Sequence, residues 1–312
     1  MRPIRAISQG ARAVIRAGRM PLVFWFFTLV FALAVVLPVG AILYGDLGHS
    51  LYAERMLNNF DLQWLAEMMN RTDGLPVYVF PPLIALVAVG YILLGTFLAG
   101  GALTVFASEE GKYRPGLFYE GCGRNFWRLF RLLLVSLVFY GVVLAASVAL
   151  KGLGKSVWGQ GMEERPLVIF GWCRSGLTVV LLLAVNMIFD YAKIRLVVED
   201  SRKSWRAALG AVKLVFRNLG GTLATYGLVA LVAVALALGY HAVSGTIPRN
   251  QALGMLLLLV LQQALVVGRI GVKLLFFGSQ LEIYRGVTAA TAIVEEPPAL
   301  ETPEVPELPA EC

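Results

Sequence analysis

The sequence predicts an all-α protein that crosses a membrane as a polytopic bundle of about six helices. Two features of its composition indicate this class. Hydrophobic residues make up 58% of the 312 positions, and the mean hydropathy is +0.73. Charged residues make up only 15%, whereas soluble domains carry roughly 25%. Because lipid tails solvate apolar side chains, a protein embedded in a bilayer needs no polar exterior.

Six apolar stretches are long enough to cross a bilayer, which takes about 20 residues of helix. Four of them contain no charged residue, while Arg174 lies in one of the others and Arg269 and Lys273 lie in the last. The expected spans are about 21–44, 77–107, 132–150, 167–189, 220–240 and 252–277. We therefore expect a membrane-spanning helical domain.

Three further segments differ from the spans in composition. Residues 1–20 are basic and amphipathic, which predicts an interfacial helix before a transmembrane domain at 21–285. Residues 286–312 are acidic and Pro-rich, so we expect a disordered cytoplasmic tail that offers a contact to a soluble protein partner. In the first outer loop, apolar residues at helical spacing over 57–68 predict a short helix on the membrane surface.

The distribution of cations predicts the orientation of the chain. Of the 27 lysines and arginines, 18 lie in segments on one side of the six spans and 6 lie on the other. Positive residues favour the cytoplasmic side, so both termini of this multi-pass protein should be cytoplasmic. The net charge of +7 does not indicate a nucleic-acid partner, because the cations flank apolar runs where anionic lipid is nearer.

Three basic amphipathic segments precede the first, third and fifth spans, which suggests three pseudo-repeats of an interfacial helix and two spans. The segment 107–110 also matches 197–200, so that Glu110 corresponds to Asp200. An alternative is that topology alone requires cations at each junction. The expected contacts to anionic lipid, equivalent in each repeat, are Arg12, Arg16, Arg19, Arg124, Arg128, Arg131, Lys213 and Arg217.

One stretch carries a family resemblance. The run from Asp190 to Asp200, followed by Ala207-Ala208-Leu209 and a basic stripe, resembles a signature in a group of uncharacterised bacterial six-span inner-membrane proteins. The close resemblance covers about 40 residues, and the six-span layout matches over the rest. It implies a bacterial inner-membrane location and this topology, and it implies no activity.

The sequence lacks the patterns that catalytic sites require. Its only histidines, His49 and His241, have no neighbouring ligands at metal-binding spacing, and no nucleophile, phosphate loop or paired acids stand out. We therefore expect no catalytic, cofactor-binding or metal site, and a protein that is not an enzyme.

Two spans instead carry polar faces, which are costly at membrane depth and should pair or meet water. Asp190 is the only acid inside or bordering a span, so we expect it to pair across helices with Arg269 or Lys273. Cations near a helix end can alternatively extend to the interface, as can Arg174. The candidate intramembrane polar cluster is Asn186, Asp190, Lys193, Gln262, Arg269 and Lys273.

These features favour two functions. The first is a non-catalytic integral membrane protein that handles or transports a small molecule or a lipid within the bilayer, which the repeat and the polar faces suggest. The second is a structural or assembly protein that binds anionic lipid through its basic helices and recruits a soluble partner through its tail.

Overall fold

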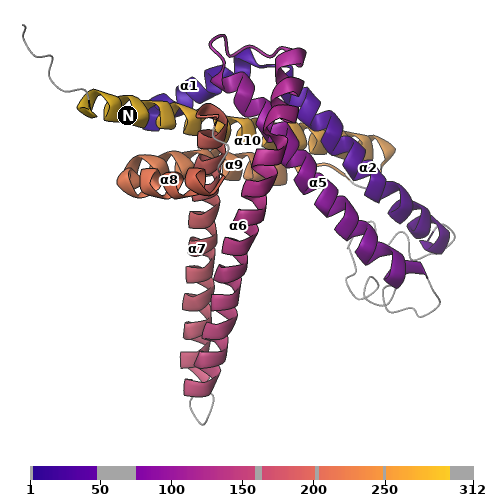
Figure 1. The fold of residues 1–312 in the computed structure, drawn as a ribbon. Coiled ribbons are helices and arrows are strands. Elements are labelled where there is room, and N and C mark those ends of the chain that lie inside the picture. The colour runs from indigo at the N-terminus through magenta and orange to yellow at the C-terminus, as the bar shows by residue number, and fades with distance from the viewer. Residues whose placement is uncertain (1–2, 48–74, 159–163, 201–203, 249–250, 296–312) are drawn as a thin grey trace, which may run out of the picture.

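The fold is described by a computed structural model over residues 3–47, 75–158, 164–200, 204–248 and 251–295. These residues form eight α-helices and no strand (Figure 1). The predicted surface helix at 57–68 lies outside the described residues. The helices are α1 (Pro3–Arg16), α2 (Met20–Leu47), α5 (Leu75–Ala107), α6 (Pro115–Trp158), α7 (Glu164–Val198), α8 (Ser204–Arg217), α9 (Leu219–Ser244) and α10 (Ala252–Glu295).

The six expected spans are confirmed, since six helices are long and apolar enough to cross a membrane. They are α2, α5, α6, α7, α9 and α10, as expected from their sequences. A helix satisfies every backbone hydrogen bond within itself, which is why long apolar segments adopt it in lipid. The class of the protein, a polytopic helical membrane protein, therefore follows from the fold.

Three of these helices extend well past the predicted spans. The second basic segment continues directly into its span as α6, because no proline occurs between Pro115 and Pro166 to interrupt the helix. At its C-terminal end α10 continues to Glu295, so residues 286–295 are helical and not part of the expected tail. The first proline after this helix is Pro297, and the rest of the tail lies outside the described residues.

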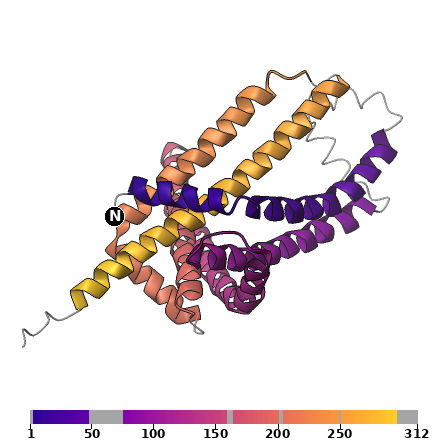
Figure 2. The same ribbon diagram turned by 90° about the horizontal axis from the view of Figure 1, so that it is seen from above.

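The spans form three hairpins that diverge from a common buried region, which we call the hub and which contains Leu103, Leu132, Ile194 and Leu274. α6 and α7 run together in one direction, while α2 and α5 run in another (Figure 1), and α9 and α10 lie side by side in a third pair (Figure 2). The buried hydrophobic residues gather at the hub, where α1 and α8 also pack. We call the diverging parts of the hairpins the arms. Apolar side chains along them remain exposed, such as Leu183, Val234 and Leu256. Lipid solvates such surfaces without any need for burial.

Each of the three basic segments packs against the hub end of the second, fourth or sixth span, which are α5, α7 and α10. α1 lies on α10, the N-terminal part of α6 lies on α5, and α8 lies on α7. The contacts are close because glycines form them: a Cβ on Gly10 would lie 2.6 Å from Ser279 Oγ, and one on Gly121 would lie 2.5 Å from Thr104 Oγ1. Small residues at helix contacts let two backbones approach, the usual packing in membranes. α5 and α7 each contact the basic segment that follows them in the chain, whereas α10 contacts α1 from the start of the chain. The three contacts therefore form a closed ring.

Buried positions in the basic segments and at the start of the spans that follow them fit the repeat. The alignment that places Arg12, Arg124 and Lys213 together rests on cations, which topology alone would also position. The same alignment brings buried residues together, as a repeat predicts, although amphipathic helices with cations in the same register also bury the opposite face. The matching buried sets are Ala6, Phe118 and Ala207, then Gly10, Cys122 and Ala211, and then Phe24, Ser136 and Thr225.

The ring contact between α5 and α6 yields a stability prediction. A Cβ on Gly101 would lie 2.5 Å from Cys122 Sγ and 2.7 Å from the backbone oxygen of Phe118, which cannot move cheaply. We expect Gly101→Ala to destabilise the protein by about 1–3 kcal/mol, the usual cost of overpacking. Thermal unfolding in a mild detergent measures this. The control is Gly141→Ala on α6, where a Cβ meets open space. Equal stability of the two variants would contradict the contact.

Candidate functional site

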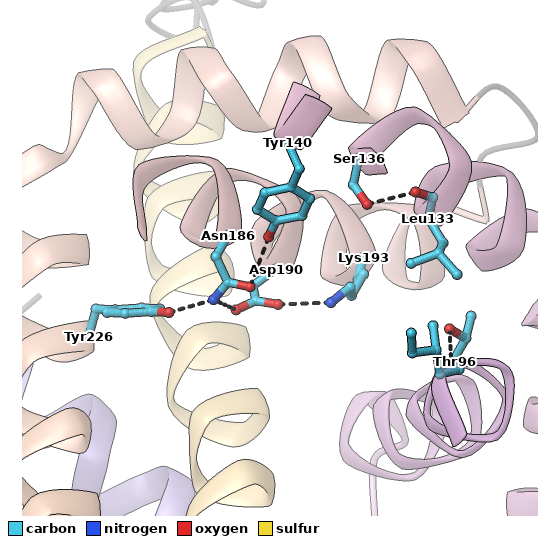
Figure 3. Close-up of polar contacts among 9 residues, drawn as sticks. Thr96, Leu133, Ser136, Tyr140, Asn186, Asp190, Lys193 and Tyr226 are labelled. Atoms are coloured by element: carbon cyan, nitrogen blue, oxygen red, sulfur yellow. Dashed lines mark hydrogen bonds and ion pairs between the residues drawn. The ribbon is translucent and has the colours of Figure 1, made fainter. Parts of the chain in front are cut away.

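The polar face of α7 forms as predicted. Asn186, Asp190 and Lys193 lie on one side of the helix, near the hub (Figure 3). Lys193 Nζ donates to Asp190 Oδ1 at 2.9 Å, and Asn186 Nδ2 lies 3.4 Å from Asp190 Oδ2. The side chain of Asp190 is 14% exposed. A buried carboxylate needs such partners, because an uncompensated charge in a medium of low polarity is costly.

Two tyrosines extend this network to neighbouring helices, and sequence reasoning missed both. Tyr140 on α6 donates to Asn186 Oδ1 at 3.3 Å, and Asn186 Nδ2 donates to the hydroxyl oxygen of Tyr226 on α9 at 2.5 Å (Figure 3). A tyrosine hydroxyl inside an apolar helix usually finds a partner, which was the available signal. Asn186 therefore joins three helices at one point.

A pocket of about 360 Å³ opens beside this network, between α7, α9 and α10. We call it the α7–α10 pocket. Asn186, Asp190 and Lys193 line one side, and Arg269 and Lys273 of α10 line another. The remaining wall is apolar and is built by Ala233, Leu236, Val272, Phe276 and Phe277. The structure thus brings together five of the six residues of the predicted polar cluster.

The expected ion pair between helices is not formed among the described residues. Asp190 pairs with Lys193 of its own helix, three residues away, where one turn already places the two charges together. Neither Arg269 nor Lys273 makes a hydrogen bond or an ion pair with any described residue. Lys273 Nζ lies 5.8 Å from the centre of the Phe24 ring, a cation–π distance. The α7–α10 pocket therefore holds three cations and one acid.

Gln262, the sixth residue of the predicted cluster, does not line the pocket and is exposed. Its neighbour Gln263 faces α2, where Gln263 Oε1 accepts a hydrogen bond from Trp25 Nε1 at 2.9 Å. Gln262 lies two turns, roughly 10 Å, before Arg269 along α10, so it shares the face of Arg269 without reaching the pocket. Arg174 donates to the backbone oxygen of Ser147 at 3.1 Å, so it ties α7 to α6.

The predicted lipid-contacting cations are not equivalent in the structure. Arg128 forms an ion pair with Asp200, and its side chain is 19% exposed. Arg131 lies over the ring of Trp127, 5.8 Å from its centre. Arg12 and Arg16 line a cleft that also contains Glu109, Glu282 and Arg285. Every member of the set except Arg128 is exposed, and Arg19, Arg124, Lys213 and Arg217 have none of these contacts.

A second polar network, which the sequence did not suggest, fastens the hub. Tyr284 on α10 donates to Glu199 Oε1 at 2.5 Å, and Arg195 Nε donates to the other oxygen of Glu199 at 2.8 Å. Arg285 donates to the backbone oxygens of Phe106 and Ala107, 3.3 Å and 3.0 Å away. Carbonyls at the end of a helix lack partners within it, so Arg285 caps α5. These contacts hold the C-terminal ends of three spans together.

No group of three or more histidines, cysteines or acids suited to a metal occurs among the described residues. Comparison of the chain with protein-family models, with curated proteins and with solved structures finds no match. The resemblance of 190–200 to a group of bacterial membrane proteins stays a prediction. The site must therefore be interpreted from its own chemistry, which is that of a partly apolar pocket with excess positive charge.

The pairing of Asp190 can be tested by double-mutant cycles. We expect Asp190→Asn to couple with Lys193→Met by about 0.5–2 kcal/mol in thermal stability, because these groups form an ion pair. Coupling of Asp190→Asn with Lys273→Met should be smaller, since no ion pair joins them. A larger coupling to Lys273 than to Lys193 would show that the pair forms across helices instead.

Proposed function

We propose that this integral membrane protein binds an anionic amphiphile, such as a lipid, in the α7–α10 pocket and moves it within the bilayer without catalysing a reaction. The observation that supports this most is the pair of cations on α10. Arg269 and Lys273 line the pocket without an acid of their own, since Asp190 is engaged by Lys193. An anion entering the pocket would provide the missing partner.

The shape and chemistry of the pocket suit an amphiphile better than a small inorganic ion. Its volume of about 360 Å³ lies within the usual range for small-molecule sites. The polar residues of α7 and α10 form one part of the wall, and Leu236, Phe276 and Phe277 form an apolar part. A charged headgroup would contact the cations, while the first carbons of a chain would contact the apolar wall.

The location that we propose is the cytoplasmic leaflet of a bacterial inner membrane, with both termini in the cytoplasm. The cation distribution supports this orientation, and the resemblance around Asp190 supports the membrane. The pocket is built near the hub, where the basic segments lie. Anionic lipids are abundant in that leaflet, so the proposed substrate class is present beside the site.

The alternative is a structural or assembly protein. The exposed cations Arg124, Lys213 and Arg217 favour it, because they offer contacts to anionic lipid without any pocket. The acidic segment that would recruit a soluble partner lies outside the described residues. In this reading the α7–α10 pocket is incidental, and neutralising its cations should not change lipid binding.

A binding measurement separates the two functions. Purified protein is incubated with short-chain phosphatidylglycerol or phosphatidylcholine, and bound lipids are counted by native mass spectrometry. We expect Arg269→Gln with Lys273→Gln to weaken phosphatidylglycerol binding by about tenfold, as expected for the loss of roughly 1.4 kcal/mol of charge interaction. Phosphatidylcholine binding should change little. The matched control is Lys151→Gln with Arg206→Gln, two exposed cations outside the pocket.

Movement of the lipid needs its own readout. In proteoliposomes, transfer of a fluorescent phosphatidylglycerol between leaflets is followed by quenching from outside. The native protein should accelerate transfer, and the pocket variant should not. Anionic lipid binding that survives in the pocket variant but disappears in Arg124→Gln with Lys213→Gln and Arg217→Gln would overturn the proposal and favour the structural role.

A further inference from the structure

The repeat places Arg16 of the first unit in the position of Arg128 in the second, and Glu110 in the position of Asp200. In the second unit, Arg128 and Asp200 form an ion pair. In the first unit the corresponding acid is engaged elsewhere, because Glu110 Oε2 lies 2.8 Å from Arg114 Nη2. In the first unit, Arg16 therefore lacks the acidic partner that Arg128 has in the second unit.

Uncompensated cations gather at this point. A cleft of about 410 Å³, which we call the Arg16 cleft, is lined by Ile15, Arg16, Gly18, Arg19, Lys112 and Tyr113. Its lining contains three cations and no acid. None of the three makes a hydrogen bond or an ion pair with any described residue. The neighbouring cleft shares Arg16 but also contains Glu109 and Glu282, and Glu282 forms an ion pair with Arg285.

The Arg16 cleft is built from two segments that the fold holds in place. Arg16 is the last residue of α1, Gly18 and Arg19 lie in the turn between α1 and α2, and Lys112 and Tyr113 lie in the loop between α5 and α6. Gly111 has φ of 59°, a conformation that favours glycine, so the loop turns sharply just before Lys112. Tyr113 packs on Phe118, with ring centres 5.6 Å apart, and this contact anchors the loop to the hub.

Tyr113 adds a neutral donor to the cations. Burial raises the pKa of its hydroxyl above the usual value, and the nearby Tyr119 and Cys122 raise it further. A tyrosine hydroxyl is protonated at neutral pH in any case, and it can donate a hydrogen bond to an anion. Arginine presents a planar set of donors that suits phosphate oxygens, and lysine adds a compact charge.

We propose that the Arg16 cleft binds a phosphate group, carried by a membrane lipid or by a soluble molecule. Three cations and a hydroxyl donor match the several oxygens of one phosphate. Ile15, whose side chain is 77% exposed at the rim, offers an apolar contact that a phospholipid would use and a soluble phosphate would not. This site is separate from the α7–α10 pocket and does not depend on the function proposed for it.

The test uses the full chain in a mild detergent and measures binding by native mass spectrometry and by thermal shift. One arm adds short-chain phosphatidylglycerol, and the other adds glycerol phosphate, which carries the same phosphate chemistry without acyl chains. Both arms are measured in the Arg269→Gln, Lys273→Gln background, so that lipid bound in the α7–α10 pocket does not mask the result. We expect Arg16→Gln with Arg19→Gln and Lys112→Gln to weaken phosphate binding at least about tenfold in whichever arm binds, a loss of about 1.4 kcal/mol or more.

The matched control is Arg124→Gln with Lys213→Gln and Arg217→Gln, which removes the same charge from exposed positions that line no described pocket. It should bind like the background variant alone. A second comparison uses single changes at exposed lysines, which should not disturb folding. Lys112→Glu is the cleft variant, and Lys213→Glu is its control. Equal loss in the cleft variants and their controls, no loss in either, or no binding in either arm by the background variant would overturn the proposal.

Discussion

The rest of the structure depends on one kind of interaction, the close packing of the three basic segments against α5, α7 and α10 at the hub. Glycines make this contact possible, as at Gly10 against Ser279 and at Gly121 against Thr104. The arms beyond the hub diverge and leave apolar side chains for lipid, so they contribute little to holding the hairpins together. Because α1 rests on α10, the N-terminal helix closes the ring that positions α7, α9 and α10 around their pocket.

We attribute the chemistry of the molecule to differences in how the three proposed units satisfy their charges. The three proposed units share some of their buried positions, but their charges are satisfied differently. Asp190 is engaged by Lys193, which leaves Arg269 and Lys273 to face the pocket. Charged groups are expensive at membrane depth, so a protein that keeps unmatched cations there gains from an anionic ligand. This reasoning favours lipid handling over a purely structural role.

The sequence was a good guide to features that depend on one helix at a time. Apolar length predicted all six spans, and helical spacing placed Asn186, Asp190 and Lys193 on one face. It was a poor guide to contacts between helices, because these depend on how each helix is rotated and which neighbours it meets. Thus Tyr226 was missed, and Lys193 took the place expected for a cation of α10. Continuous helix through the second basic segment also escaped prediction, since amphipathic and apolar segments differ in composition but not in backbone.

The central claim is that an anionic headgroup occupies the α7–α10 pocket while Asp190 stays with Lys193. A cryo-electron microscopy map of the protein in nanodiscs that contain phosphatidylglycerol tests it most directly. The account predicts density for a phosphate within hydrogen-bond distance of Arg269 and Lys273, with the acyl chain along the apolar wall. An empty pocket, or a pocket closed by a direct ion pair between Asp190 and a cation of α10, would contradict it.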